Sequence, residues 1–85
     1  MARVRSIEAG NQAVKPHTSE VDGYVQIIST ADGPLVHLST FGSDSRASAP
    51  KSSQSMQFDR EQASALITTF IAAFGPDVVR SPSET

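Results

Sequence analysis

Apolar and polar residues alternate along Ser52–Phe58, and the pattern then changes to a helical spacing. Met56 and Phe58 fall on one side of the alternating run, and serine and glutamine fall on the other. A period of two over this length predicts a half-buried strand. Beyond it, the apolar spacing predicts an amphipathic helix over Arg60–Phe74. The apolar stripe of this helix consists of Ala63, Leu66, Ile67, Phe70, Ile71 and Phe74.

The residues at both ends of this helix are typical of helix boundaries. Asp59 precedes the first turn, where its carboxylate can accept hydrogen bonds from the exposed N–H groups of that turn. Gln62, three residues on, can reach back in the manner of a capping box. Gly75 can adopt the left-handed conformation that ends a helix, and Pro76 prevents its continuation. The helix is therefore predicted to run from just after Asp59 to just before Gly75.

The centre of the chain predicts two more strands. Tyr24–Thr30 and Leu35–Phe41 are rich in aromatic and β-branched residues, and Ala31–Pro34 between them has the composition of a turn. The proline favours a loop longer than two residues. In Leu35–Phe41 both faces carry apolar residues. A sheet with one face in water would not need this, so we expect the second face to be covered or to stack flat ligands.

The N-terminal residues leave two alternatives open. Val4–Glu8 and Gln12–Lys15 would make a hairpin around a Gly-Asn turn, or residues 1–20 form a partly disordered arm. The Ser-rich loop over Gly42–Lys51 is expected to be mobile. Residues 77–85 are expected to be a flexible tail. Residues 1–76 thus form a single domain.

These elements predict an α+β fold, with a small antiparallel sheet of three to five strands followed by one C-terminal amphipathic helix packed on it. An 85-residue chain buries only about 60% of its unfolded surface, so it usually needs additional stabilisation. The chain has no cysteine for a disulfide, and its two histidines are too few for a structural zinc. Oligomerisation is the remaining common route, and we expect a homodimer.

The helix face opposite the stripe carries small uncharged residues. A solvent-facing helix usually carries lysine and glutamate there. One interpretation is that these residues are tolerated in water. The sharper hypothesis is that they form an interface with a second copy or another protein. The candidate interface residues are Ala65, Thr68, Thr69, Ala72 and Ala73.

Charge and hydropathy narrow the classes of function. The net charge is −2 without a basic stripe, which argues against a dedicated duplex-binding domain. No apolar run approaches the length of a membrane span. Arg3 and Arg5 are not followed by the apolar core of a secretory signal. We therefore expect a soluble cytoplasmic protein that does not associate with membranes.

No arrangement typical of catalysis is evident. His37 lies mid-strand beside Ser39 without an acid in that strand, so a satisfied or solvent-facing histidine is the simpler interpretation. Asp59 and Glu61 are explained by their place at a helix N-terminus. No phosphate-binding loop of the Walker type occurs. We expect neither an enzyme nor a bound cofactor or metal, and no small-molecule substrate is evident.

Single-stranded nucleic acid is the other ligand that the composition allows. Tyr24 and Phe41 are candidates for stacking on bases, and Lys15, Arg46 and Lys51 for contacts with phosphates. The alternative is that both aromatics are core residues and that the cations are scattered over the surface.

The order of strands and helix resembles the small transcriptional coactivators of the positive-cofactor-four type. The similar segments are Leu35–Phe41, Pro50–Lys51 and Phe58–Leu66. The sequence departs from that family at Ser39, where the family has an arginine, and at Ala63, where it has an aromatic residue. A second resemblance is to small proteins of actinobacteria and their phages that end in a similar strand and helix.

The resemblance to the coactivators implies a dimer that binds single-stranded DNA. Our leading hypothesis is accordingly a non-enzymatic binding module that holds single-stranded nucleic acid on its sheet. The alternative is a homodimeric protein-interaction or regulatory module, such as a phage or bacterial accessory protein. This alternative would act through the small-residue face of the helix.

Overall fold

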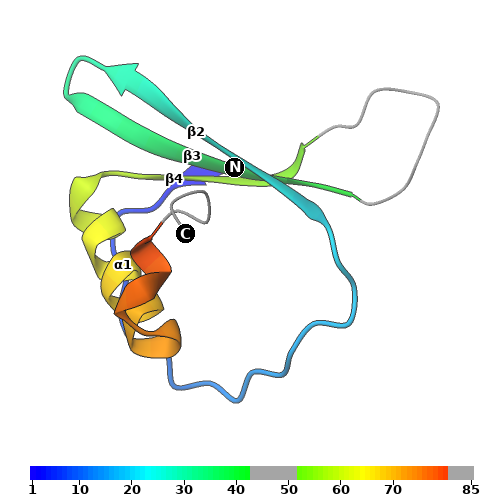
Figure 1. The fold of residues 1–85 in the computed structure, drawn as a ribbon. Helices are drawn as coiled ribbons and strands as arrows, with labels where there is room; N and C mark the ends of the chain where they lie inside the picture. Colours follow the sequence, from blue (N-terminus) through cyan, green and yellow to red (C-terminus); the bar gives the residue numbers. More distant parts are fainter. Residues whose placement is uncertain (43–51, 81–85) are drawn as a thin grey trace.

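The computed structural model describes residues 1–42 and 52–80. Its sheet contains β1 (Ala2–Arg3), β2 (Asp22–Thr30), β3 (Gly33–Phe41) and β4 (Ser52–Phe58) in the order β1-β4-β3-β2 (Figure 1). Helix α1 (Arg60–Phe74) and the 3₁₀ turn η1 (Pro76–Val79) follow. The predicted α+β fold with one C-terminal helix is confirmed. Strands β2, β3 and β4 pair antiparallel, whereas β1 pairs parallel with β4.

The loop between β2 and β3 is shorter than predicted. Thr30 pairs with Gly33, so only two residues connect the strands. Gly33 has a φ of 117°, which favours glycine, and the Thr30 hydroxyl donates to its carbonyl oxygen at 2.7 Å. Pro34 fits inside β3 because the pairing with β4 begins only at Val36. Its missing N–H therefore costs no hydrogen bond to β4.

Of the two alternatives for the N-terminal residues, the structure has an arm and not the hairpin. Neither Val4–Glu8 nor Gln12–Lys15 forms a strand, and the segment between β1 and β2 is an irregular, mostly exposed arm. The two residues of β1, which precede the arm, form a short edge strand beside β4 instead. The Val4 N–H then donates to the Gln57 carbonyl at 2.9 Å. This segment lacks the alternating β-branched residues that would bury one side of a hairpin. Its Gly-Asn turn sequence is therefore not sufficient to form a hairpin.

Both ends of α1 agree with their sequence signals. The Asp59 carboxylate accepts a hydrogen bond from the Gln62 N–H at 2.9 Å, which satisfies one of the free donors of the first turn. At the other end, Gly75 has φ 94° and ψ 163° and its N–H donates to the Ile71 carbonyl at 2.8 Å. The positive φ was expected, although ψ lies outside the left-handed helical region. Pro76 then starts η1, so the predicted tail begins with a 3₁₀ turn.

The strand register divides the sheet into two faces. Residues paired directly across strands share a face. The face that we call the Val25 face carries Val25, Ile27, Val36, Leu38, Met56 and Phe58. The opposite one, which we call the Tyr24 face, carries Tyr24, Gln26, Ile28, Leu35, His37, Ser39 and Phe41. Apolar residues therefore lie on both faces, as predicted.

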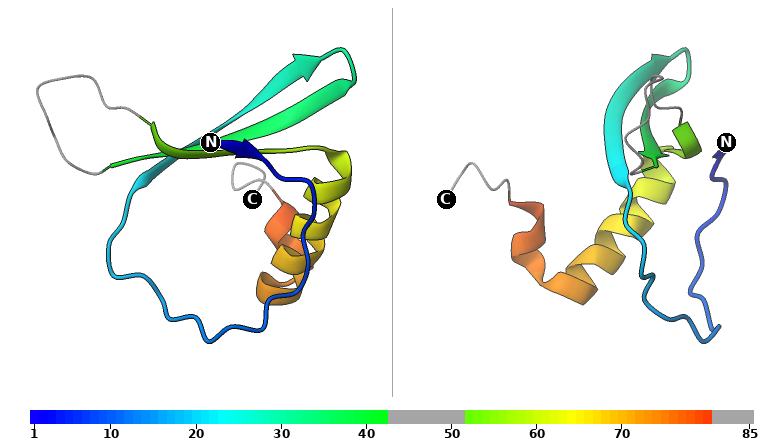
Figure 2. Two further views of the ribbon diagram at one scale, coloured as in Figure 1. Left: turned by 180° about the vertical axis from the view of Figure 1, so that it is seen from behind. Right: turned by 90° about the vertical axis from the view of Figure 1, so that its right-hand side faces the viewer.

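The core within one chain is small. Among the described residues, the buried apolar side chains are Leu35 and Phe58, with 7% and 8% of their surface exposed. Helix α1 meets the sheet near its own start, where Gln62 is buried, and then slopes away from it (Figure 2, right). The expectation that the whole apolar stripe packs on the sheet is therefore wrong for its C-terminal half.

Candidate interaction surfaces

The stripe of α1 is more exposed toward the end of the helix, except at Ile71, which is half-buried. Leu66 is half-buried, Ile67 and Phe70 are each 48% exposed, and Phe74 is 68% exposed. In the right-hand view of Figure 2, the end of α1 and η1 lie farther out than β2, clear of the strands. Val78 of η1 is 41% exposed and extends the apolar character of this end. The distal half of α1 is thus an apolar surface that its own sheet does not cover.

The Val25 face is a second uncovered apolar surface. Val25 and Ile27 in β2 are 69% and 76% exposed, and Val36 and Met56 in the neighbouring strands are also exposed. Among the described side chains of this face, only Phe58, at the end of β4 beside the start of α1, is buried. Large apolar side chains that gather on one face, rather than scatter singly, are typical of binding surfaces.

The small-residue face of α1 is accessible as well. Thr68, Thr69, Ala72 and Ala73 are exposed and Ala65 is half-buried. The hydroxyls of Thr68 and Thr69 donate to the carbonyls of Ser64 and Ala65, each at 3.0 Å. Because both hydroxyls are satisfied within the helix, a partner could bury this face without leaving them unpaired. The face stays a candidate interface.

Of the residues predicted to bind nucleic acid, the structure brings Tyr24 and Phe41 together. Their ring centroids lie 5.1 Å apart at 83°, an edge-to-face arrangement, and Tyr24 is 61% exposed. Lys15 lies in the irregular arm, and Arg46 and Lys51 lie outside the described residues. Asp22, which pairs with Phe41 across the strands, puts an acidic group beside the two rings.

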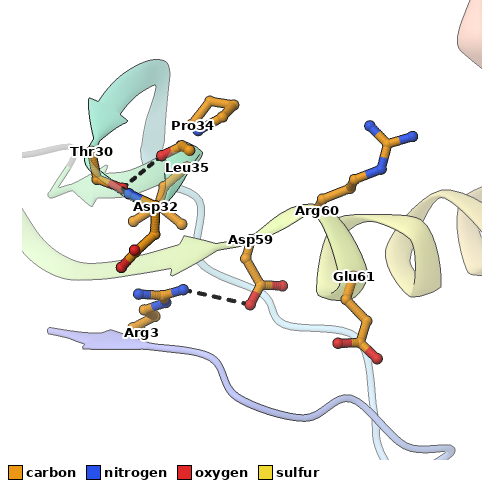
Figure 3. Close-up of a pocket in the computed structure, with 9 residues that line it drawn as sticks. Arg3, Thr30, Asp32, Pro34, Leu35, Asp59, Arg60 and Glu61 are labelled. Atoms are coloured by element: carbon orange, nitrogen blue, oxygen red, sulfur yellow. Dashed lines mark hydrogen bonds and ion pairs between the residues drawn. The ribbon is translucent and has the colours of Figure 1, made fainter.

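A depression of about 360 Å³ lies where β1, the β2–β3 loop and the start of α1 meet (Figure 3). Its lining contains Arg3, Asp32, Asp59, Arg60 and Glu61, so both charges are present. The Arg3 guanidinium lies 3.6 Å from the Asp59 carboxylate, and Arg60 points away from this pair. Both partners are partly exposed, so the ion pair contributes less than about 1 kcal/mol. The Arg3–Asp59 ion pair thus links β1 to the residue that caps α1.

His37 has the satisfied role that was expected. Its Nδ1 lies 3.0 Å from the Gln57 side-chain amide, across the β3–β4 pair on the Tyr24 face. This contact links the side chains of two neighbouring strands.

No family model, curated protein or solved structure matches the chain. Within residues 1–42 and 52–80, no helix combines the length and apolar character needed to cross a membrane. The resemblance to the coactivators and the binding of nucleic acid therefore stay predictions.

Sequence reasoning missed that the helix stripe is exposed. The apolar residues on both faces of Leu35–Phe41 indicated an uncovered sheet face, but they carried no signal about the helix stripe. It also missed the Arg3–Asp59 pair, since no pattern in the sequence places the first strand parallel to the last one. Sequence reasoning also missed that the outer edge of β2 is open to pairing. This strand has no charged residue between Asp22 and Asp32.

Proposed function

We propose that this chain is a non-enzymatic protein-interaction module that acts as a homodimer. The observation that carries the proposal is the exposed apolar stripe at the end of α1, where Ile67, Phe70 and Phe74 lack a covering element among the described residues. A helix that exposes such a stripe in water gains stability by burying it against another chain.

The exposure of the apolar side chains supports the same proposal. Ile67 and Phe70 of α1 are each 48% exposed and Phe74 is 68% exposed, and Val25 and Ile27 of β2 are 69% and 76% exposed. Large apolar side chains gathered in this way are typical of binding surfaces. A second copy is the partner that is always present where this chain is made.

Sedimentation of the purified chain at several concentrations tests this proposal. We expect the wild type to be a dimer, and Phe70→Gln to weaken it because glutamine removes apolar area while keeping helix propensity. Thr69→Gln tests the small-residue face, and Ser6→Gln, at an exposed residue of the arm, is the control. A wild-type chain that sediments as a monomer and stays folded would overturn the proposal.

Binding of single-stranded nucleic acid is the second candidate. It is supported by the exposed Tyr24 ring, which lies beside Phe41 on an accessible sheet face. Fluorescence anisotropy of a labelled oligonucleotide, titrated at two salt concentrations, tests it. Binding that weakens with salt and is lost in Tyr24→Ala would favour this function, since phosphate contacts release counterions. No binding at either salt concentration would exclude it.

A further inference from the structure

Strand β2 is an open edge without the features that normally protect one. It is the last strand in the order β1-β4-β3-β2, and it runs for nine residues. Its register with β3 is continuous, without a bulge. From Gly23 to Thr30 it contains no charged residue and no proline. Natural proteins usually block exposed edges with lysine, proline, bulges or short strands. An unblocked edge of this length is suited to pair with another strand.

The pairing with β3 determines which backbone groups of β2 face outward. Ser29 is paired with Pro34, which has no N–H, so this is a non-hydrogen-bonded pair. In an antiparallel ladder the two kinds of pair alternate. The N–H and C=O groups of Gly23, Val25, Ile27 and Ser29 therefore point away from β3, toward the free edge.

We infer that the free edge of β2 pairs with β2 of a second copy, antiparallel and centred on Gln26. This inference rests on the proposed homodimer and gives its geometry. In a continuous sheet, a two-fold axis that relates one edge strand to its copy stands perpendicular to the sheet and makes the strands antiparallel. The register centred on Gln26 pairs all four outward-facing residues with one another.

The side chains are complementary in this register. Val25 lies opposite Ile27 of the second copy on the Val25 face, and Tyr24 lies opposite Ile28 on the other face. Such aromatic and β-branched cross-strand pairs stabilise sheets. The single charged residue, Asp22, lies opposite Thr30. Shifting the centre to Ile27 would instead place Asp22 opposite Asp32, where like charges repel.

This pairing also accounts for the direction of α1. The two sheets become one, with the Val25 faces of both copies on the same side. The distal end of α1 projects past β2, on the side of the sheet away from β1 (Figure 2, right). In the dimer, this is the side on which the second copy lies. The exposed stripe is thereby brought toward the second copy rather than into solvent.

A single introduced cysteine tests the register, because the chain has no cysteine of its own. Gln26 is exposed and would face itself across the two-fold axis. It belongs to a non-hydrogen-bonded pair, in which the Cα atoms lie about 4.5 Å apart, within the disulfide range of about 4.4–6.8 Å. We expect Gln26→Cys to form a disulfide-linked dimer under mild oxidation. Gln12→Cys, at a glutamine of the arm that is also exposed, is the control.

A charged residue on the edge tests the contact itself. Ile27 is 76% exposed, so Ile27→Lys leaves the fold of one chain intact, which circular dichroism verifies. In the dimer this lysine would lie against Val25 of the second copy, and we expect the dissociation constant to rise at least about tenfold. Val14→Lys, at an arm residue that is 79% exposed, is the matched control.

The outcomes separate this inference from the proposed function. Rapid cross-linking at position 26 but not 12, together with weaker dimers for Ile27→Lys but not Val14→Lys, supports the edge pairing. The edge pairing is overturned, and the homodimer retained, by a different set of results. In that case Phe70→Gln weakens the wild-type dimer, Ile27→Lys does not, and Gln26→Cys forms no cross-link. A folded wild-type monomer overturns both.

Discussion

Phe58 and Phe74 allow one substitution to be compared in two environments. Phe58 ends β4 and is 8% exposed, whereas Phe74 ends α1 and is 68% exposed. Replacing either by alanine removes the same atoms. If burial within one chain decides stability, the two variants should differ in proportion to the surface that each ring has lost to the fold.

The structure sets the expected magnitudes. A buried Phe→Ala substitution costs about 3–5 kcal/mol, because apolar contacts are lost and a cavity is left. The buried fraction of Phe74 is about a third of that of Phe58, so Phe74→Ala should cost about 1–2 kcal/mol. A domain of this length has a total stability of about 4–13 kcal/mol. Phe58→Ala should therefore populate the unfolded state strongly, since few other apolar residues are buried.

Urea unfolding followed by far-ultraviolet circular dichroism measures both values. The protein concentration must be low and identical for all variants, because association would add to apparent stability. Equal losses for the two variants at low concentration would refute the reasoning, since they would show that α1 packs on its own sheet along its whole length. A Phe74→Ala effect that grows with concentration would instead place Phe74 in the interface.

Two further predictions concern the ends of α1. Asp59→Ala should cost about 1 kcal/mol of stability, because the hydrogen bond from the Gln62 N–H is lost. This loss should lower the melting temperature by about 4–8 °C. Asp59→Asn should retain most of the stability, because asparagine can also cap the helix. An equal loss in both would assign the effect to the Arg3 ion pair. Gly75→Ala should cost about 1–3 kcal/mol, because its φ of 94° disfavours a side chain and the new Cβ would lie 3.1 Å from the Asp77 carboxylate. An unchanged urea midpoint would contradict this.

The sequence was sufficient to predict the elements whose patterns are local. The alternation in Ser52–Phe58 and the stripe in Arg60–Phe74 gave the last strand and the helix with the bounds that the structure has. Asp59 and Gly75 marked the helix ends because caps depend on residues within one turn. The central hairpin was also predicted. Each of its strands begins two residues earlier than predicted, at Asp22 in β2 and at Gly33 in β3.

The remaining features depend on contacts between distant residues. The parallel pairing of Ala2–Arg3 with β4 joins two segments more than half the chain apart, and no local pattern encodes it. The stripe of α1 has the composition of a core, and periodicity cannot distinguish a surface that its own sheet covers from one that a second chain covers. The same limit explains why Phe70 was expected to be buried.

The candidate sites divide in the same way. Tyr24 and Phe41 were each predicted as candidates for stacking on bases, but the contact between their rings depends on the β2–β3 register and was not predicted. The open edge of β2 could have been noticed from its lack of charge and proline. The position of β2 at the end of the sheet required the strand order, which the sequence does not specify.

Sedimentation equilibrium of the wild-type chain, from micromolar to submillimolar concentration, tests the central claim most directly. We predict the mass of two copies, falling toward one copy in Phe70→Gln but not in Ser6→Gln. A mass of one copy at every concentration, for a chain that unfolds cooperatively, would contradict the claim that a second copy covers the exposed stripe of α1.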